Sequence, residues 1–250
     1  MSCAARISHV SITYHGHVAL HDVSLEFHRG DFVGVIGPNG AGKTTLLTVI
    51  NGLGRIRAGK VEILGEHAES RSFGRLRRRI GYVPQRSNID PRVPISCCEA
   101  VLTGRVGRIG LLRQPGPDDH EIVRRVMKQC GIEHLRDRPV GQVSGGEQQK
   151  VAFARALCQE PEIMLLDEPT ANLDPQAVSE LTALIVDVYR RLGLTVVMVT
   201  HQFDRLPDVC GRVLMMKAAR IVFDGPKAEA LDPGRLETLW STPSDRVDHA

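Results

Sequence analysis

The fold class follows from nine consecutive residues, Gly37-Pro38-Asn39-Gly40-Ala41-Gly42-Lys43-Thr44-Thr45. They match the pattern G-x-x-x-x-G-K-[ST] and lie between an apolar run, Phe32–Ile36, and a segment with helical spacing, Thr44–Asn51. Glycines let successive backbone N–H groups face phosphate oxygens, and the start of a helix adds positive potential. The context therefore predicts a phosphate-binding loop in an α/β fold. Lys43 is expected to reach the β- and γ-phosphates, and the Thr44 hydroxyl to bind Mg²⁺.

A second motif, Val143-Ser144-Gly145-Gly146-Glu147, opens a predicted helix over Gly145–Cys158. Ser-x-x-Glu is a capping box, in which the serine and the glutamate each accept the other's backbone N–H. As a lone tetrapeptide it would be read as a helix cap. Two glycines at a helix start also leave backbone N–H groups bare, so these residues can take a second, phosphate-facing role.

Two adjacent carboxylates follow the apolar run Ile163–Leu166. A buried strand there delivers Asp167 and Glu168 to the carboxyl edge of the sheet, where α/β folds bind ligands. Asp167 is placed to hold the Mg²⁺ shell, and Glu168 can polarise the attacking water as a general base. Adjacent carboxylates are also common on surfaces, and the phosphate loop is what favours the functional interpretation.

Three further side chains follow or end predicted strands. His201 comes after Thr195–Thr200 and can hydrogen-bond a γ-phosphate, although a lone histidine at such a place is usually just solvated. Gln85 can reach the metal and its water by its amide oxygen. Tyr14 can supply an aromatic face for adenine, with core packing as the competing interpretation.

The rest of the chain alternates strands and helices, as in a largely parallel sheet with right-handed crossovers. We expect one domain over residues 1–232, a helical subdomain of about 87–145 inserted in its core, and a peripheral tail over 233–250. Within the insertion, Asp118 and Asp119 can cap a helix that Gly131 ends. The predicted strands are 7–14, 23–27, 32–36, 60–64, 80–83, 163–167, 195–200 and a hairpin near 213–223, and the other predicted helices are 44–51, 95–105, 145–158 and 176–192.

Composition excludes several classes of protein. The chain is 42% hydrophobic and 24% charged with a net charge of +3, which gives no nucleic-acid footprint. The run Arg75-Leu76-Arg77-Arg78-Arg79 is interpreted as a solvated helix face. No apolar run approaches the roughly 20 residues that cross a bilayer, and Met1–Arg6 lacks the apolar segment of a signal peptide. We expect a soluble chain whose membrane role, if any, comes through a partner.

The cysteines and histidines do not indicate a metal site. The six cysteines lack metal-ligand spacing, so we expect reduced cytosolic thiols. The early histidines invite a metal-site hypothesis, but alternating strands naturally expose such residues, and we favour that interpretation. These histidines are His9, His15, His17, His21 and His28.

In this order, the motifs resemble those of the nucleotide-binding subunits of ABC transporters, from roughly Arg6 to Pro226. The resemblance identifies the elements one by one. They are the Walker A loop Gly37–Thr45, the Q-loop residue Gln85, the signature motif Val143–Glu147, the Walker B strand Ile163–Glu168, the D-loop Asn172-Leu173-Asp174, the switch histidine His201 and the adenine-stacking Tyr14.

The resemblance also implies architecture and partners. It implies a P-loop ATPase domain with a mixed or parallel sheet core, an N-terminal antiparallel β-subdomain and an inserted α-helical subdomain. Two copies would pack head to tail, so that Ser144, Gly145, Gly146, Glu147 and Asp174 of one face the ATP and Mg²⁺ on the Walker loop of the other. The subunit would act at the cytoplasmic face of the inner membrane, on integral permease subunits served indirectly by an extracytoplasmic solute-binding protein. Residues 95–105 would dock a permease helix.

One departure and one further likeness bear on function. The signature has Val-Ser-Gly-Gly-Glu where the family usually has Leu-Ser-Gly-Gly-Gln, and the charge of Glu147 near a polyphosphate is expected to weaken the closed dimer. The segments Val83–Asp90, Val93–Ser96, Leu102–Arg105 and Gly110–Arg113 resemble the manganese/zinc-type metal importers.

Other functions stay open. Iron–siderophore or cobalamin import would use the same nucleotide motifs, and so would a soluble ABC-type ATPase of iron–sulfur cluster assembly. The segment after Gln85 favours transport. A large DNA-bound ABC ATPase is disfavoured because no long coiled-coil insertion separates the Walker A and signature regions.

Overall fold

A six-stranded sheet forms the centre of the structure, a computed structural model that describes residues 2–14, 16–54, 56–68, 73–85, 93–110 and 113–241. Parallel pairing joins five of its strands, and only β10 runs antiparallel to its neighbour. Strands β3, β7 and β8 are buried along their whole length, as their unbroken apolar runs predict. The strand order is β10 (Arg220–Pro226), β9 (Arg212–Lys217), β3 (Phe32–Ile36), β8 (Thr195–Val199), β7 (Ile163–Asp167) and β6 (Ile80–Val83).

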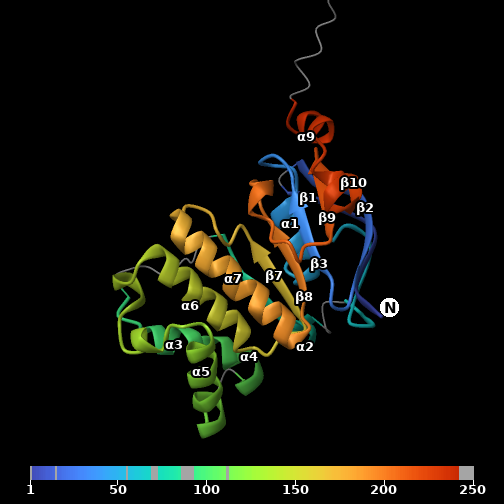
Figure 1. The fold of residues 1–250 in the computed structure, drawn as a ribbon. Coiled ribbons are helices and arrows are strands. Elements are labelled where there is room, and N and C mark those ends of the chain that lie inside the picture. The colour runs from blue at the N-terminus through green and yellow to red at the C-terminus, as the bar shows by residue number, and fades with distance from the viewer. Residues whose placement is uncertain are drawn as a thin grey trace, which may run out of the picture.

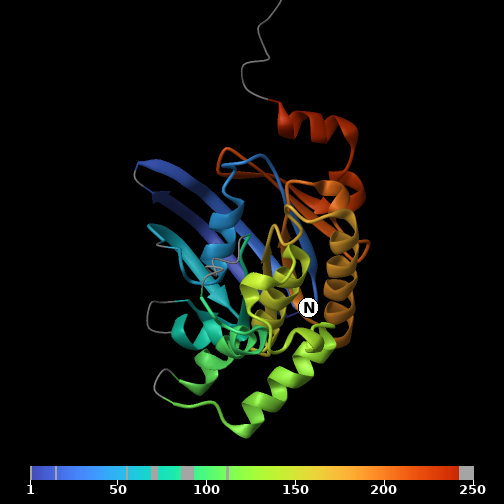
Figure 2. The same ribbon diagram turned by 90° about the vertical axis from the view of Figure 1, so that its left-hand side faces the viewer.

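A second, antiparallel sheet lies across helix α1 (Lys43–Ile50) from the first (Figure 1 and Figure 2). Four apolar side chains of α1 join a core that contains residues of both sheets, so the helix after the phosphate loop is held from two sides. The N-terminal strands are longer than their alternating pattern predicts. The order in this sheet is β2 (His17–His28), β1 (Cys3–Tyr14), β4 (Ala58–Ile63) and β5 (Glu66–His67).

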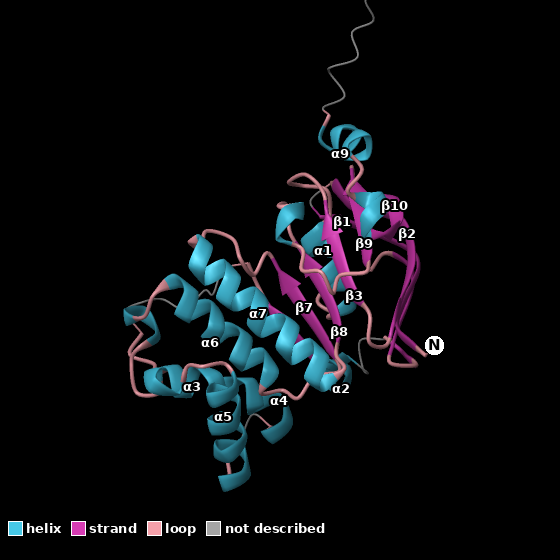
Figure 3. Cartoon of the chain, in the orientation of Figure 1, coloured by secondary structure: helices cyan, strands magenta, loops and turns pink. Residues whose placement is uncertain are grey.

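Helices cover the other face of the central sheet and extend beyond it, so that Figure 3 shows helices gathered on one side and strands on the other. Helices α6 (Gly145–Leu157) and α7 (Pro175–Leu192) pack on the sheet. The inserted subdomain contains α3 (Cys97–Leu102), α4 (Val106–Ile109) and α5 (Pro117–Gln129), and α3 and α5 pack against α6. The predicted helical insertion is present, but residues 86–90, 111 and 112 of the importer-like segments lie outside the described residues.

Each main helix of this region begins with a side-chain cap. Ser96 and Glu99 form a capping box at α3, where the Ser96 hydroxyl and N–H lie 2.7 and 2.8 Å from the Glu99 carboxylate. At α5, Asp119 sits at the third helical position and accepts the Gly116 N–H at 3.0 Å, so the predicted aspartate acts from inside the helix. Asp174 caps α7 by accepting the Ala177 N–H.

Three parts of the structure refine the expectations. The strands near 60–64 and 80–83 belong to different sheets, because β4 pairs with β1 and β6 pairs with β7. The arginine run spans the short helix α2 (Phe73–Leu76) and a 3-10 turn. Arg75 and Arg78 are exposed as expected, but Arg77 donates to the carbonyls of Asn51 and Gly52 and so supports the end of α1.

The segment after residue 226 is structured. Helices α8 (Lys227–Ala230) and α9 (Pro233–Trp240) follow β10, and Leu239 is buried in the core under the central sheet. The Lys217 ammonium donates to the Thr238 and Ser241 carbonyls at the end of α9. The first part of the predicted tail is therefore attached to the sheet, and residues 242–250 lie outside the described part of the chain.

Candidate nucleotide-binding site

The phosphate loop connects β3 to α1, and its backbone lies close against strand β9. A side chain at Gly37 would meet the Met216 carbonyl at 2.1 Å, and Gly37 has a φ of 153°. The Lys43 ammonium donates to the carbonyls of Gly37 and Pro38, at 2.8 and 2.9 Å. Burial lowers the pKa of Lys43, and the carboxylates of Glu168 and Asp167 oppose that effect. The loop is therefore already folded around its lysine, as its pattern predicts.

A cavity of about 490 Å³ opens above this loop. The loop side is formed by residues predicted from the motif, together with Gln85 and Glu168. Another part of the lining is formed by His17, Val18 and Ala19 at the start of β2. The sequence indicated no nucleotide contact for these three residues. Val18 is 56% exposed, so its side chain is accessible to a ligand in the cavity. The loop residues in the lining are Asn39, Gly40, Gly42, Lys43, Thr44 and Thr45.

Tyr14 lies beside this cavity without lining it. It pairs with His17 across the β1–β2 hairpin, next to the pair formed by Thr13 and Val18. Its side chain is 40% exposed, so the competing interpretation of core packing is wrong. Contact between Tyr14 and an adenine ring stays a prediction.

Asp167 is held at the carboxyl end of β7, pointing at the phosphate loop. The Thr44 hydroxyl donates to its Oδ1 at 3.2 Å, and the Tyr82 hydroxyl donates to its Oδ2 at 3.3 Å. Burial raises the pKa of Asp167, while these two hydrogen bonds and Lys43 act in the opposite direction. Burial, and then the charge of Asp167, raise the pKa of Tyr82 to about 12. Thr44 and Asp167 thus form an oxygen pair that suits Mg²⁺. Tyr82 was missed because its strand pattern carries no sign of this partner.

Glu168 contacts both Gln85 and His201, the two remaining predicted site residues of this half. Gln85 Nε2 donates to Glu168 Oε2 at 2.7 Å, and His201 Nδ1 lies 3.1 Å from the same oxygen. Glu168 is only 8% exposed and has a left-handed backbone conformation with a φ of 48°, which is uncommon for a residue with a side chain. Its N–H donates to the Val199 carbonyl, which holds that conformation. The structure therefore brings Gln85, Glu168 and His201 together at one carboxylate.

The signature residues lie at a second cavity, of about 350 Å³. Ser144, Gly146 and Glu147 line it, together with His134 and Asp174. The capping box is present, because the Ser144 N–H and hydroxyl lie 2.7 and 2.8 Å from Glu147 Oε2. These two bonds hold the pKa of Glu147 below its usual range, so the carboxylate is charged. His134 Nε2 is 3.9 Å from the other carboxylate oxygen.

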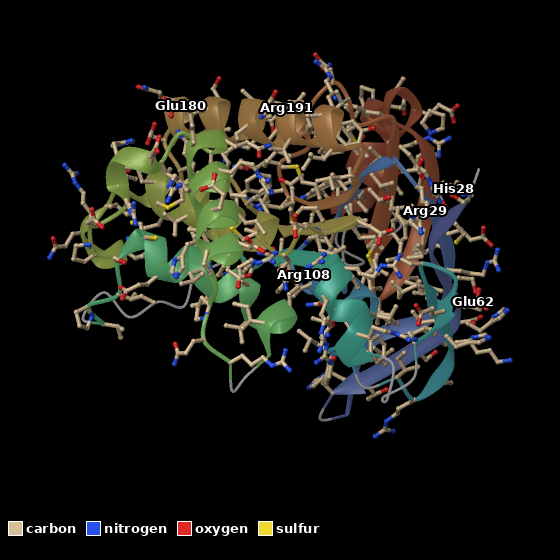
Figure 4. All side chains as sticks on the ribbon, turned by 90° about the horizontal axis from the view of Figure 1, so that it is seen from below. His28, Arg29, Glu62, Arg108, Glu180 and Arg191 are labelled. Atoms are coloured by element: carbon tan, nitrogen blue, oxygen red, sulfur yellow. The ribbon has the colours of Figure 1, made fainter. Side chains whose placement is uncertain are left out.

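No lining residue is shared by the two cavities. The phosphate-loop cavity belongs to α1, β2 and the ends of β6 and β7, whereas the signature cavity belongs to the starts of α6 and α7. Glu180, which Figure 4 shows near one end of α7, also lines the signature cavity and pairs with Lys150. The predicted site residues therefore divide into two separate half-sites within one chain.

The described histidines, cysteines and helices add three facts. His9 bonds Asp22, and among the described residues no group of three or more His, Cys, Asp or Glu side chains could hold a metal ion; His15 lies outside them. All six cysteines are free thiols. Of the helices in the described ranges, none has the length and hydropathy to span a membrane.

Comparisons with known proteins show which family the chain resembles. A family model described as "ABC transporter" matches residues 20–171. The manganese transport system ATP-binding protein MntB of Bacillus subtilis is 38% identical over 241 residues, which cover 96% of this chain and 92% of that protein. The phosphonates import ATP-binding protein PhnC of Stutzerimonas stutzeri is 35% identical over 257 residues, covering 98% and 92%.

A solved dimeric structure of a bacterial ABC transporter cassette is 29% identical, with a TM-score of 0.78, and the match covers 89% of this chain and 98% of that one. The family model spans more than half of the chain, and the two relatives match nearly its whole length. The chain therefore belongs to the family of ABC transporter ATP-binding subunits, which hydrolyse ATP to power transport.

Proposed function

We propose that two copies of the chain close head to tail around two ATP molecules and drive import through a separate membrane permease. The observation that carries this proposal is the division of the site into two cavities with no shared lining residue. A cavity that offers a helix start and a serine, but no phosphate loop, suits the completion of a site on another molecule. The dimeric cassette among the solved relatives supports the pairing of two copies.

Within one half-site, the residues take distinct roles. Lys43 and the loop N–H groups bind the phosphates, and Thr44 with Asp167 holds Mg²⁺, which supplies charge neutralisation when bound. Gln85 contributes its amide oxygen on that side. Glu168 accepts a proton from the attacking water, since it is buried and lines the cavity. His201 contacts Glu168, and we assign to it a hydrogen bond with the γ-phosphate.

Across the dimer, the second copy completes the site. Ser144, Gly145 and Gly146 offer the start of α6 to the γ-phosphate, with Glu147 and Asp174 at the rim. Tyr14 and Val18 cover the adenine on the first copy. ATP therefore binds the closed pair better than the open one, and hydrolysis releases it.

For the cargo, we propose a manganese or zinc ion. The support is the B. subtilis manganese relative and the likeness of the segments around the helical insertion, and the phosphonate relative makes a different cargo the main alternative. The permease would dock at residues 95–105, which form α3 and the turn after it. The subunit would then lie peripherally on the cytoplasmic face of the inner membrane, with a solute-binding protein on the far side.

Matched serine variants test the dimer. Ser144→Ala removes the capping box of α6, and Ser96→Ala removes the equivalent capping box of α3. Each substitution should destabilise the chain by about 1 kcal/mol. Only Ser144→Ala should also weaken ATP-driven dimerisation, measured by sedimentation velocity in the non-hydrolysing Glu168→Gln background. Equal dimerisation of the two variants would rule out the head-to-tail site.

Uptake assays test the cargo. Cells that lack the gene should lose accumulation of ⁵⁴Mn or ⁶⁵Zn, and the wild-type gene should restore it while Glu168→Gln should not. Normal metal uptake, together with loss of growth on a phosphonate as the phosphorus source, would show that the cargo is a phosphonate and not a metal ion. Normal uptake of both, with ATPase activity intact, would refute the proposed cargo.

A further inference from the structure

The last helix, α9, ends against the turn that carries His201. This turn, residues 201–205, follows β8. The indole ring of Trp240, the last residue of α9, packs edge to face on the phenyl ring of Phe203, with ring centroids 6.3 Å apart and an angle of 66° between the planes. Figure 1 shows α9 beyond the ends of β9 and β10, so the C-terminal helix reaches the turn of a predicted catalytic residue from outside the sheet.

The aromatic pair is separate from the buried core. Phe203 is 37% exposed and Trp240 is 40% exposed, so each ring contacts solvent as well as its partner. Phe203 is the only apolar residue in the sequence His201-Gln202-Phe203-Asp204-Arg205. Edge-to-face pairs of this kind add stability beyond that of the area they bury. Phe203 is therefore the one side chain of this turn that can attach it by an apolar contact.

Hydrogen bonds hold the two ends of the turn. At the start, the Gln202 N–H donates to the Thr200 hydroxyl at 3.0 Å, and the Thr200 N–H donates to the Val35 carbonyl of β3. At the end, Arg205 Nη1 donates to the Thr170 carbonyl at 2.7 Å. Both ends are thus fixed to segments next to β3 and β7, and the aromatic pair attaches the residue between them.

The side chain of His201 depends on this turn for its direction. It is 43% exposed, and its Nδ1 lies 3.1 Å from Glu168 Oε2. An exposed side chain on a loop is mobile unless the backbone beneath it is held. Because Phe203 lies two residues further along the same turn, its contact with Trp240 restricts the backbone that directs the imidazole toward Glu168.

Helix α9 is a firm support for Trp240. The side chain of Leu239 is buried in the core under the central sheet. Lys217, at the end of β9, donates to the carbonyls of Thr238 and Ser241, which lie on either side of Trp240 in the sequence. The indole is therefore held by a helix end that one buried side chain and two hydrogen bonds attach to the sheet.

We propose that Trp240 is a positioning residue for ATP hydrolysis, which acts through Phe203 to hold His201 against the Glu168 carboxylate. The inference rests on the role of His201 in the proposed function. Neither aromatic ring lines the nucleotide cavity. Loss of the pair therefore loosens the histidine and leaves the phosphate-binding residues in place, so it lowers the rate of hydrolysis and not the affinity for ATP.

The first experiment observes His201 directly. In the full chain with ¹³C-labelled histidine, the Cε1–Hε1 signal of His201 is assigned with His201→Ala. Trp240→Ala and Phe203→Ala should both shift this signal, and Trp240→Phe should return it most of the way to its wild-type position. Val222→Ala, which shortens an exposed side chain on the neighbouring β10, should not shift it. An unchanged signal in Trp240→Ala overturns the proposal, and so does an equal shift of the His134 signal, which would indicate a general rearrangement.

The second experiment measures steady-state ATPase activity. Trp240→Ala and Phe203→Ala should each lower kcat by about three- to tenfold, which corresponds to the loss of one aromatic pair, and should leave the KM for ATP within about twofold. The double variant should lose no more than the weaker single variant, because both changes remove the same contact. Trp240→Phe should restore most of the rate, and Val222→Ala should match the wild type. Thermal melting establishes that the variants are folded.

The outcomes separate this inference from the proposed function. Full activity of Trp240→Ala, together with an inactive His201→Ala, overturns the positioning role and leaves the ATP site intact. Multiplied losses in the double variant also overturn it, since the two rings would then act independently. A raised KM with an unchanged kcat would assign Trp240 to nucleotide binding instead. Wild-type activity of His201→Ala overturns the role of His201 in the proposed function, and the positioning role with it.

Discussion

Replacement of Glu147 by glutamine should tighten the ATP-driven dimer. In the structure the Glu147 carboxylate accepts the Ser144 hydroxyl at 2.8 Å and is charged. A γ-phosphate oxygen that takes over the single proton of this hydroxyl would lie about 5 to 6 Å from the carboxylate, on the far side of the hydroxyl oxygen. Because glutamine keeps the capping box, Glu147→Gln removes the repulsion and leaves the helix start in place.

The magnitude follows from that distance. Two unit charges about 5.6 Å apart repel by roughly 0.7 kcal/mol in water and about 1.5 kcal/mol at half that dielectric constant. His134 offsets little of this, because it lies 3.9 Å from Glu147 and its side chain is 65% exposed. A closed dimer contains two such contacts, so the dimer dissociation constant should fall by about 10- to 100-fold.

Sedimentation velocity with ATP in the Glu168→Gln background measures this constant, and ATPase assays of the chain with native Glu168 measure apparent ATP affinity and turnover. Glu121→Gln removes an equal charge from the exposed face of α5 and should change neither. The gain should shrink in high salt, because salt screens the repulsion. An unchanged dissociation constant, together with unchanged ATP affinity and turnover, would refute the electrostatic reasoning.

The remaining predictions concern three other positions. Gly145→Ala should stabilise the chain by about 0.5 to 1 kcal/mol in urea unfolding, because the added methyl group meets Leu173 at an ordinary contact distance of 3.8 Å. The same substitution should weaken ATP-driven dimerisation about tenfold. Normal dimerisation would show that the second copy does not approach this residue. Arg105→Gln should cost about 3 kcal/mol in the same assay because it removes the buried cation that binds Asp119, Glu160 and the Cys158 carbonyl. A loss as small as that of Arg124→Gln, an exposed arginine on α5, would contradict this buried network. The raised pKa of Tyr82 favours its neutral form in the folded chain, so the stability that this group contributes is complete below pH 10 and is lost as the pH rises to about 12. Tyr82→Phe should reduce this alkaline loss of stability by about 1 kcal/mol after allowance for solvent screening. Identical pH profiles of unfolding for the two chains would disprove the assignment.

The sequence predicts what is encoded locally. The strand Ile163–Asp167 was predicted to the residue, because an unbroken apolar run ends in two carboxylates. The phosphate loop and the Ser144 capping box are equally local, since their geometry depends on glycines and on a serine three residues before a glutamate. The gathering of Gln85 and His201 at Glu168 follows from the rule that parallel strands end at one edge.

Contacts between residues far apart in the chain could not be predicted from the sequence. Tyr82 alternates in a strand like any half-buried tyrosine, and only the pairing of β6 with β7 reveals Asp167 beside it. The role of Val18 depends on the approach of the antiparallel sheet to the phosphate loop. Arg155 occupies a regular position in a helix, and the close approach of Gly104 to its carbonyl becomes visible only when the turn after α3 is packed against it.

The two hydrogen bonds from Lys43 to its own loop have an entropic consequence. An ammonium has three donors, and the carbonyls of Gly37 and Pro38 already take two of them. The side chain has therefore lost its rotamer freedom, worth roughly 2 kcal/mol for a lysine, during folding rather than during nucleotide binding. When ATP binds, the Lys43 ammonium has one donor that is not yet hydrogen-bonded, and its orientation is already fixed. Alignment of the phosphates by Lys43 therefore costs no further side-chain entropy.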